Sequence, residues 1–92
     1  MRTLADIKRR ATTGTQLEVV GQTKRPALVG TVRTITDARS LSARSYEFTS
    51  SHTGDETYVG TWPKASDTRI IDADTFEYDL RPGPGVIRLR FA

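Results

Sequence analysis

A chain of 92 residues without cysteine can form one folded domain, residues 1–92, and it excludes disulfide bridges and thiolate metal sites. Its apolar runs are too short to cross a bilayer, and the opening residues 1–6 lack the apolar stretch of a secretion signal. We therefore expect a mature, cytoplasmic protein that does not bind a membrane.

The net charge of +3 is unevenly distributed. Residues 1–44 carry nine Lys or Arg and three acids, whereas residues 45–92 carry five Lys or Arg and eight acids. Such asymmetry is typical of a protein with a polyanion-binding end. The alternative is that the charge serves only solubility.

The first element is predicted as a helix over residues 4–12. Thr3 can cap it, with Asp6 three residues later in the pattern of a capping box. Three apolar side chains share one face at helical spacing: Leu4, Ile7 and Ala11. The last turn is basic, with Lys8, Arg9 and Arg10. Gly14 suits the left-handed conformation that ends a helix.

After Gly14 the sequence alternates with the period of two that is typical of strands. We predict strands over residues 16–20, 27–36, 42–49, 56–62 and 69–71. The apolar residues of 27–36 change parity before Ile35, which predicts a bulge or bend near Gly30. Residues 37–44 fit either a turn or the start of the next strand. The segment from Trp62 to Asp67 contains Pro63 and predicts a single helical turn.

The C-terminal segment carries the strongest hairpin pattern in the sequence. Apolar residues alternate with acids in the first strand and with arginines in the second. The predicted pairs are Phe76 with Phe91, Tyr78 with Leu89, Leu80 with Ile87, Glu77 with Arg90 and Asp79 with Arg88. This register collects the apolar side chains on one face and leaves residues 81–86 as the loop.

Together these elements predict a mainly β (α+β) fold. A short N-terminal helix precedes a 6–7-stranded antiparallel sheet, since strand patterns recur at spacings of about ten residues. We expect the sheet to curl into a small SH3-like or OB-like barrel, with the helix over one opening or edge.

The residues that could support catalysis do not form a recognisable pattern. His52 lies in a Ser/Gly-rich loop, where a general base would lack orienting partners. A metal site built from His52, Asp55 and Glu56 lacks the spacing of zinc or calcium sites. The remaining acids are predicted to serve turns and the hairpin arginines: Asp72, Asp74, Glu77 and Asp79. We expect no enzyme activity, no cofactor and no metal.

Two sets of side chains are candidates for binding. The basic set could contact nucleic-acid phosphates and contains Lys8, Arg9, Arg10, Lys24 and Arg25; in the fold, Arg33, Arg39 and Arg44 could lie near it. Its alternative is a charged solvent face. The aromatic set could stack bases or grip a peptide and contains Tyr46, Tyr58 and Trp62. Its alternative is core, which we favour because aromatic burial dominates small cores.

Several short motifs resemble a group of small uncharacterised proteins of actinobacteria and their phages or mobile elements. They are the opening Thr3-Leu4-Ala5-Asp6-Ile7-Lys8-Arg9, Gly14-Thr15, the turn Trp62-Pro63-Lys64-Ala65-Ser66 and the closing Leu89-Arg90-Phe91. The resemblance spans the whole sequence and brings no catalytic residues with it. It implies a phage-type accessory protein that acts in the host cytoplasm, and it leaves the partner open.

We therefore expect a non-catalytic, macromolecule-binding module, with nucleic acid favoured through the N-terminal basic face. The alternative is a protein-binding module that docks on a host protein through an exposed sheet edge or through Tyr58 and Trp62. A small enzyme is the least favoured class. Open sheet edges can pair between molecules, so both a monomer and a homodimer are compatible with the sequence.

Overall fold

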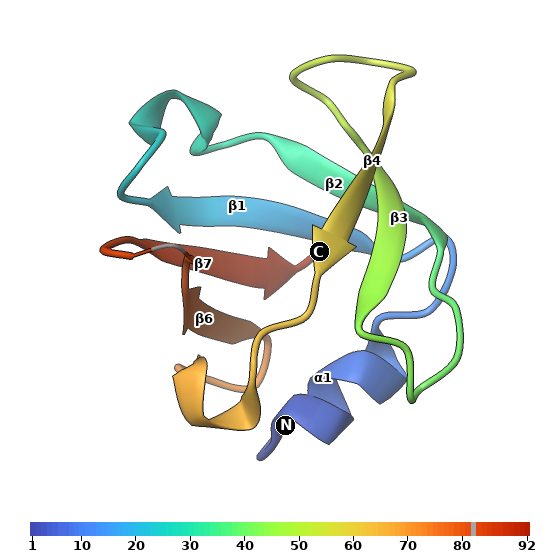
Figure 1. The fold of residues 1–92 in the computed structure, drawn as a ribbon. Coiled ribbons are helices and arrows are strands. Elements are labelled where there is room, and N and C mark those ends of the chain that lie inside the picture. The colour runs from blue at the N-terminus through green and yellow to red at the C-terminus, as the bar shows by residue number, and fades with distance from the viewer. Residues whose placement is uncertain (82) are drawn as a thin grey trace.

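A computed structural model describes residues 1–81 and 83–92 as one curled antiparallel sheet with a short helix beside it (Figure 1). The strand order is β4-β3-β2-β1-β7-β6-β5. The strands are β1 (Gln16–Gln22), β2 (Val32–Asp37), β3 (Ser45–Ser50), β4 (Thr57–Thr61), β5 (Thr68–Ile70), β6 (Thr75–Asp79) and β7 (Val86–Phe91). The mainly β prediction is confirmed, and the sheet is a half-barrel whose two edges are β4 and β5.

The N-terminal helix α1 (Leu4–Arg10) forms for the predicted reason. Thr3 and Asp6 make a reciprocal capping box, in which each side chain accepts from the other residue's backbone N–H. The helix ends two residues earlier than predicted, where the Ala11 amide donates to the Ile7 carbonyl. Ile7 is fully buried against the sheet, which gives this short helix the packing it needs. No helix of the described residues is long and apolar enough to cross a bilayer.

The core lies on the concave face of the sheet and receives α1 at one end. Alternate residues of the strands point into it, as period-two patterning requires. Its buried members are Ile7, Ala11, Leu17, Val19, Ile35, Tyr46, Phe48, Trp62, Phe76, Tyr78, Ile87, Leu89 and Phe91.

The predicted strand over 27–36 is wrong in its first half. Pro26–Leu28 form a 3₁₀ turn, η1, in which the Val29 amide donates to the Pro26 carbonyl. Proline favours this because its fixed φ suits a helical turn and it donates no ladder hydrogen bond. The bend expected near Gly30 is a turn in which Gly30 has a φ of +94°, and β2 then begins at Val32.

The other boundaries lie close to the predicted ones. β1 continues to Gln22 through an irregularity between Val19 and Gly21. The ambiguous residues 37–44 form a connection, and β3 begins at Ser45. The helical turn expected within 62–67 is confirmed as η2 (Ala65–Asp67).

The register predicted for the C-terminal hairpin is wrong by two residues. Phe76 faces Leu89 and Tyr78 faces Ile87, with Glu77 opposite Arg88. The Leu80 amide donates to the Gly85 carbonyl at 2.8 Å, so the reversal is tighter than the predicted loop 81–86. A shift of two keeps every side chain on its predicted face. Pro82, within that loop, lies outside the described residues.

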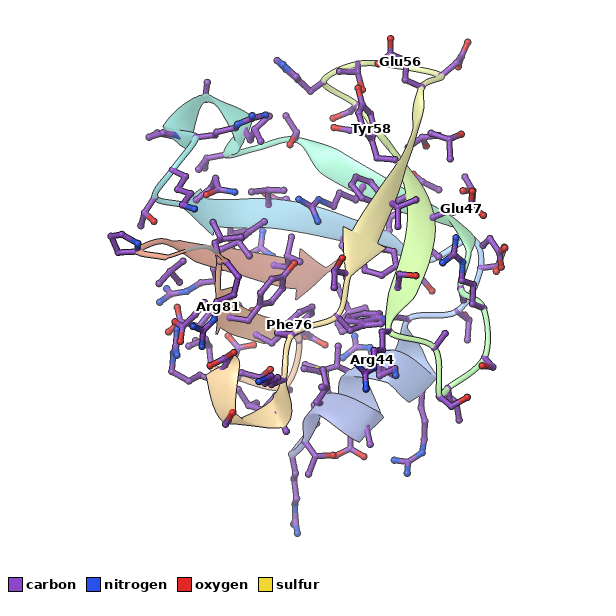
Figure 2. All side chains as sticks on the ribbon, viewed as in Figure 1. Arg44, Glu47, Glu56, Tyr58, Phe76 and Arg81 are labelled. Atoms are coloured by element: carbon purple, nitrogen blue, oxygen red, sulfur yellow. The ribbon has the colours of Figure 1, made fainter. Side chains whose placement is uncertain are left out.

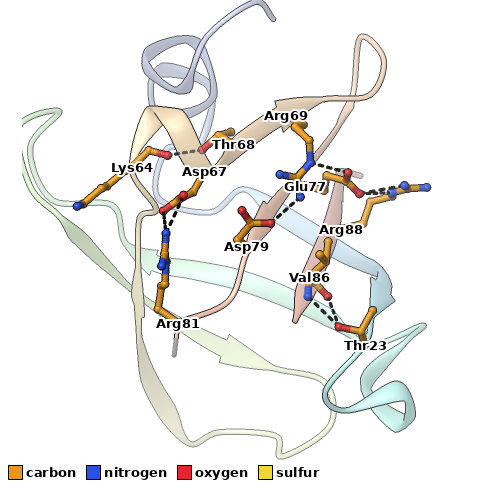
Figure 3. A network of polar contacts seen from close by, with 10 residues as sticks. All are labelled: Thr23, Lys64, Asp67, Thr68, Arg69, Glu77, Asp79, Arg81, Val86 and Arg88. Atoms are coloured by element: carbon orange, nitrogen blue, oxygen red, sulfur yellow. Dashed lines mark hydrogen bonds and ion pairs between the residues drawn. The ribbon is translucent and has the colours of Figure 1, made fainter. Parts of the chain in front are cut away.

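The corrected register also changes the ion pairs on the convex face. Glu77 binds Arg69 at 2.8 Å and Arg88 at 2.9 Å, and Asp79 binds Arg69 at 2.9 Å (Figure 3). Arg90, predicted to face Glu77, instead binds Glu18 of β1 at 2.8 Å. The acids of the hairpin therefore tie β5, β6 and β7 together.

We predict that Phe91→Ala strongly destabilises the protein. Phe91 is 6% exposed, packs on Phe76 at 5.7 Å between ring centroids, and pairs with Leu17 of β1. Truncating such a ring costs about 3–5 kcal/mol, which lowers the melting temperature of a domain this size by more than ten degrees. Leu41→Ala, at a 59%-exposed site, is the control and should melt like the parent protein. Equal melting of the two variants would contradict the burial of Phe91.

We also predict a pH-dependent effect of Glu77→Gln. The hydrogen bond from Arg69, supported by Arg88 against a smaller effect of burial, holds the pKa of Glu77 below its ordinary value of 4.5. A lowered native pKa stabilises the fold above the unfolded-state pKa, and this contribution disappears as the pH falls through the native pKa. The variant should melt a few degrees lower at pH 7, and the difference should vanish in acid. Glu47→Gln, whose ion pair with Arg39 spans 3.8 Å, is the control with little expected change. A constant difference at all pH values would contradict this assignment.

Candidate binding site

A pocket of about 640 Å³ opens where the half-barrel fails to close, between β4 and the end of β6. We call it the seam pocket. Its lining residues are Arg33, Phe48, Val59, Gly60, Thr61, Trp62, Pro63, Lys64, Asp67, Tyr78, Asp79, Leu80 and Arg81. Figure 2 shows Arg81 on the side of this opening that lies away from β4.

Arg33 is a charged residue that reaches the interior of the half-barrel. It has the parity of Ile35 in β2, and its neighbours in the sheet are Leu17 of β1 and Ser50 of β3. Its side chain is half-buried, and the guanidinium lies over the Phe48 ring at 4.5 Å from the centroid. Nη1 donates to the Tyr46 hydroxyl at 3.2 Å. This position would ordinarily hold an apolar side chain.

The groups around Arg33 do not neutralise its charge. Burial opposes the charge, but the oxygens of Tyr46 and Tyr78 outweigh it and keep the pKa of Arg33 above its ordinary value. Burial also raises the pKa of Tyr78, so that hydroxyl is neutral at physiological pH. Among the residues that the structure describes, no carboxylate forms an ion pair with Arg33.

The Tyr46 ring is fixed in place by β4. A Cβ atom on Gly60 would lie 2.5 Å from Tyr46 Cζ, so only glycine leaves room for the ring. On another side Trp62 packs against Tyr46 with a centroid distance of 4.6 Å. Glycine at this position of β4 therefore holds the hydroxyl where it meets Arg33.

The acids at the rim of the seam pocket already have partners. Asp67 accepts two hydrogen bonds from Arg81, at 3.0 and 3.1 Å, and Asp79 binds Arg69 (Figure 3). Lys64 lies at the same rim, and Figure 3 shows its side chain extending away from this network. The pocket therefore keeps a positive character that comes from Arg33 and Lys64.

The edge of β4 borders the seam pocket with backbone groups that have no hydrogen-bond partner among the described residues. The Trp62 amide donates to the Arg44 carbonyl opposite it at 2.8 Å. Hydrogen bonds alternate along an antiparallel ladder, so Gly60 and Tyr58 also bond to β3. The N–H and C=O groups of Thr57, Val59 and Thr61 then point away from β3, toward the edge.

The structure divides the predicted basic set between two places. The helical residues have partners within the protein: Lys8 donates to the Ala43 carbonyl, Arg9 binds Asp6, and Arg10 binds Asp74 and lies over the Phe91 ring. Lys24 and Arg25 lie between β1 and η1, far from α1 along the half-barrel (Figure 1). Lys24 lies beside Gly85, and Arg25 lines a smaller pocket of about 190 Å³. The five residues do not form one face.

The predicted aromatic set is mostly interior. Trp62 is 9% exposed and Tyr46 is fully buried, as the core alternative requires. Tyr58 is half-buried, packs on Phe48 at 5.8 Å and donates to Glu56 Oε2. Tyr58 lines the smaller pocket, whereas Trp62 lines the seam pocket. The two do not form a common exposed surface.

The other candidate groups stay apart. His52 lies in the exposed connection between β3 and β4, where its amide donates to the Ser50 side chain. Within residues 1–81 and 83–92, no three His, Asp or Glu side chains lie close enough together to hold a metal ion.

Arg33 was expected among the solvent-facing basic residues, and its interior position was missed. Its shared parity with Ile35 was the available signal.

Comparisons of the sequence and fold with protein-family models, curated proteins and solved structures find no significant match. The resemblance to the actinobacterial and phage group stays a prediction.

We predict that Gly60→Ala displaces the Tyr46 ring. Overpacking of this kind costs about 1–3 kcal/mol and lowers the melting temperature. The fluorescence of Trp62, the single tryptophan of the protein, should change because its ring contacts Tyr46. Thr61→Ala, at an exposed neighbouring position, is the control and should leave both measurements unchanged. Unchanged melting and fluorescence of Gly60→Ala would contradict the tight contact.

Proposed function

We propose that the protein is a non-catalytic binding module that takes an extended segment of a partner protein as an added strand on β4. The observation that carries this proposal is the edge of β4, whose free backbone groups border the seam pocket. Strand addition uses such an edge for affinity and a neighbouring pocket for specificity. An added strand would occupy the opening between β4 and β6.

The two edges of the sheet differ in how well they are protected. Natural edge strands are blocked by short length, charged side chains or proline. β5 has three residues and carries Arg69, so it follows this rule. β4 is longer, contains neither charge nor proline, and presents Val59 at 61% exposure. An unprotected edge is a liability unless it has a partner, which supports a binding role for β4.

This proposal develops the protein-docking alternative rather than the nucleic-acid one. Nucleic-acid binding through Lys8, Arg9, Arg10, Lys24 and Arg25 has less support, because the set is divided and its helical members are engaged. If the protein belongs with the phage-type proteins it resembles, the partner would be a protein of the host cytoplasm.

The first test selects binders from a random peptide display library on the immobilised full-length protein. We expect extended peptides whose binding slows hydrogen exchange at the Val59 and Thr61 amides. Val59→Pro removes an outward-facing N–H and leaves the β3–β4 ladder intact, so it should weaken binding about tenfold or more with a small change in melting. Leu41→Ala is a control at an exposed apolar residue outside the seam pocket.

Four results would contradict the proposal. The selection could give no binder, or peptides could protect amides away from β4. Sedimentation could show a dimer that Val59→Pro disrupts, which would assign the edge to self-association. Labelled DNA or RNA could bind at low salt and lose affinity on Lys8/Arg9/Arg10→Ala but not on Val59→Pro, which would favour the nucleic-acid function.

A further inference from the structure

Arg33 is a half-buried cation that pairs with no carboxylate among the described residues, and the seam pocket gives access to it. Withdrawing a charged group from water is costly unless the group is paired and hydrogen-bonded. Here the neighbours are the Tyr46 hydroxyl, the Tyr78 hydroxyl and the Phe48 ring, none of which is a carboxylate. These contacts orient the guanidinium and leave its full positive charge available.

Two features of the site suit a carboxylate. A guanidinium carries five N–H donors in a planar fork that matches the two oxygens of a carboxylate, and the hydroxyls use only part of this capacity. The rim adds Lys64, whereas Asp67 and Asp79 are bound by Arg81 and Arg69. The pocket therefore attracts an anion without repelling it through free acids of its own.

The anion site is built on the strand that offers the free edge. Gly60 gives the Tyr46 ring its space, and Trp62 supports the ring from the end of β4. Arg33 reaches the same pocket from β2, across β3. A segment lying along β4 would therefore pass over a cation held at a fixed position.

We infer that the segment added to β4 carries a carboxylate, from an Asp or Glu side chain or from the partner's own carboxyl terminus, that pairs with Arg33 in the seam pocket. This inference rests on the proposed function and specifies the partner's chemistry. Arg33 would then select acidic segments, and the backbone groups of β4 would hold them in register.

The first experiment needs no peptide. The Arg33 Nε–H signal of the ¹⁵N-labelled full-length protein is followed during titration with sodium acetate, sodium phosphate or sodium chloride at matched ionic strength. We expect saturable shifts with acetate and not with chloride. Shifts with phosphate alone would overturn the carboxylate assignment, and no shift with any anion would remove the site.

The second experiment uses the selected peptides and their variants. Replacing Glu or Asp by the amide, or amidating the peptide's carboxyl terminus, identifies which carboxylate is used, and one of these changes should weaken binding roughly tenfold to a hundredfold. Arg33→Met should cause a similar loss while the melting temperature stays equal or rises, since an apolar side chain of similar length fits the interior. Arg9→Met removes a charge on α1 and is the control, with less than about a twofold effect expected.

The outcomes separate this inference from the proposed function. Peptides that protect the β4 amides but bind equally well to Arg33→Met would leave strand addition in place and overturn the inference. Acetate shifts at Arg33 without any β4-binding peptide would keep the anion site and overturn strand addition. A large fall in melting temperature of Arg33→Met, with unchanged peptide affinity, would assign Arg33 a structural role and overturn the inference.

Discussion

The fold depends on the pairing of its first and last strands. The sheet order places β2, β3 and β4 on one side of β1 and β7, and β6 and β5 on the other. The ladder between β1 and β7 therefore joins two meanders into one sheet. Leu17 faces Phe91 and Val19 faces Leu89 in this ladder, and all four are buried. Because the two strands come from opposite ends of the sequence, their pairing must overcome the largest loop-closure entropy in the sheet.

Because the two meanders are joined at β1 and β7, β4 and β5 become the outer strands of the sheet. These two strands do not pair with each other, so the barrel stays open. The curl of the sheet brings β4 toward β6, and the link through η2 lines the opening between them with Pro63, Lys64 and Asp67. The Arg81–Asp67 ion pair holds η2 against the end of β6. The opening is therefore bordered by groups that are fixed in place, and a ligand there would find its contacts already organised.

The sequence correctly predicts features that depend on neighbouring residues. It fails for features that depend on contacts between segments far apart in the sequence. The alternation of apolar and polar residues with a period of two predicts which side chains share a face of the sheet. The capping-box pattern of Thr3 and Asp6 predicts the start of α1. The hairpin register was two residues out because both registers keep the same faces, so only the loop distinguishes them. The turn that begins at Pro26 replaces the first half of the strand expected over 27–36, and the strand propensity of the Val and Thr residues concealed it. The position of Arg33 in the site could have followed from its parity with Ile35, but its neutral surroundings come from β3 and β6, which sequence spacing does not reveal.

The alternation of strand side chains explains why Arg33 has no acidic partner among the described residues. Glu77 and Asp79 lie on β6 close to the seam, but their parity directs them to the convex face, where Arg69 and Arg88 bind them. The residue between them, Tyr78, points inward and meets Arg33 with a neutral hydroxyl. An internal carboxylate on this strand would need to occupy a position that now holds an aromatic core residue. Under the carboxylate inference, the counter-ion of Arg33 comes from a ligand in the seam pocket, which also borders the free edge of β4.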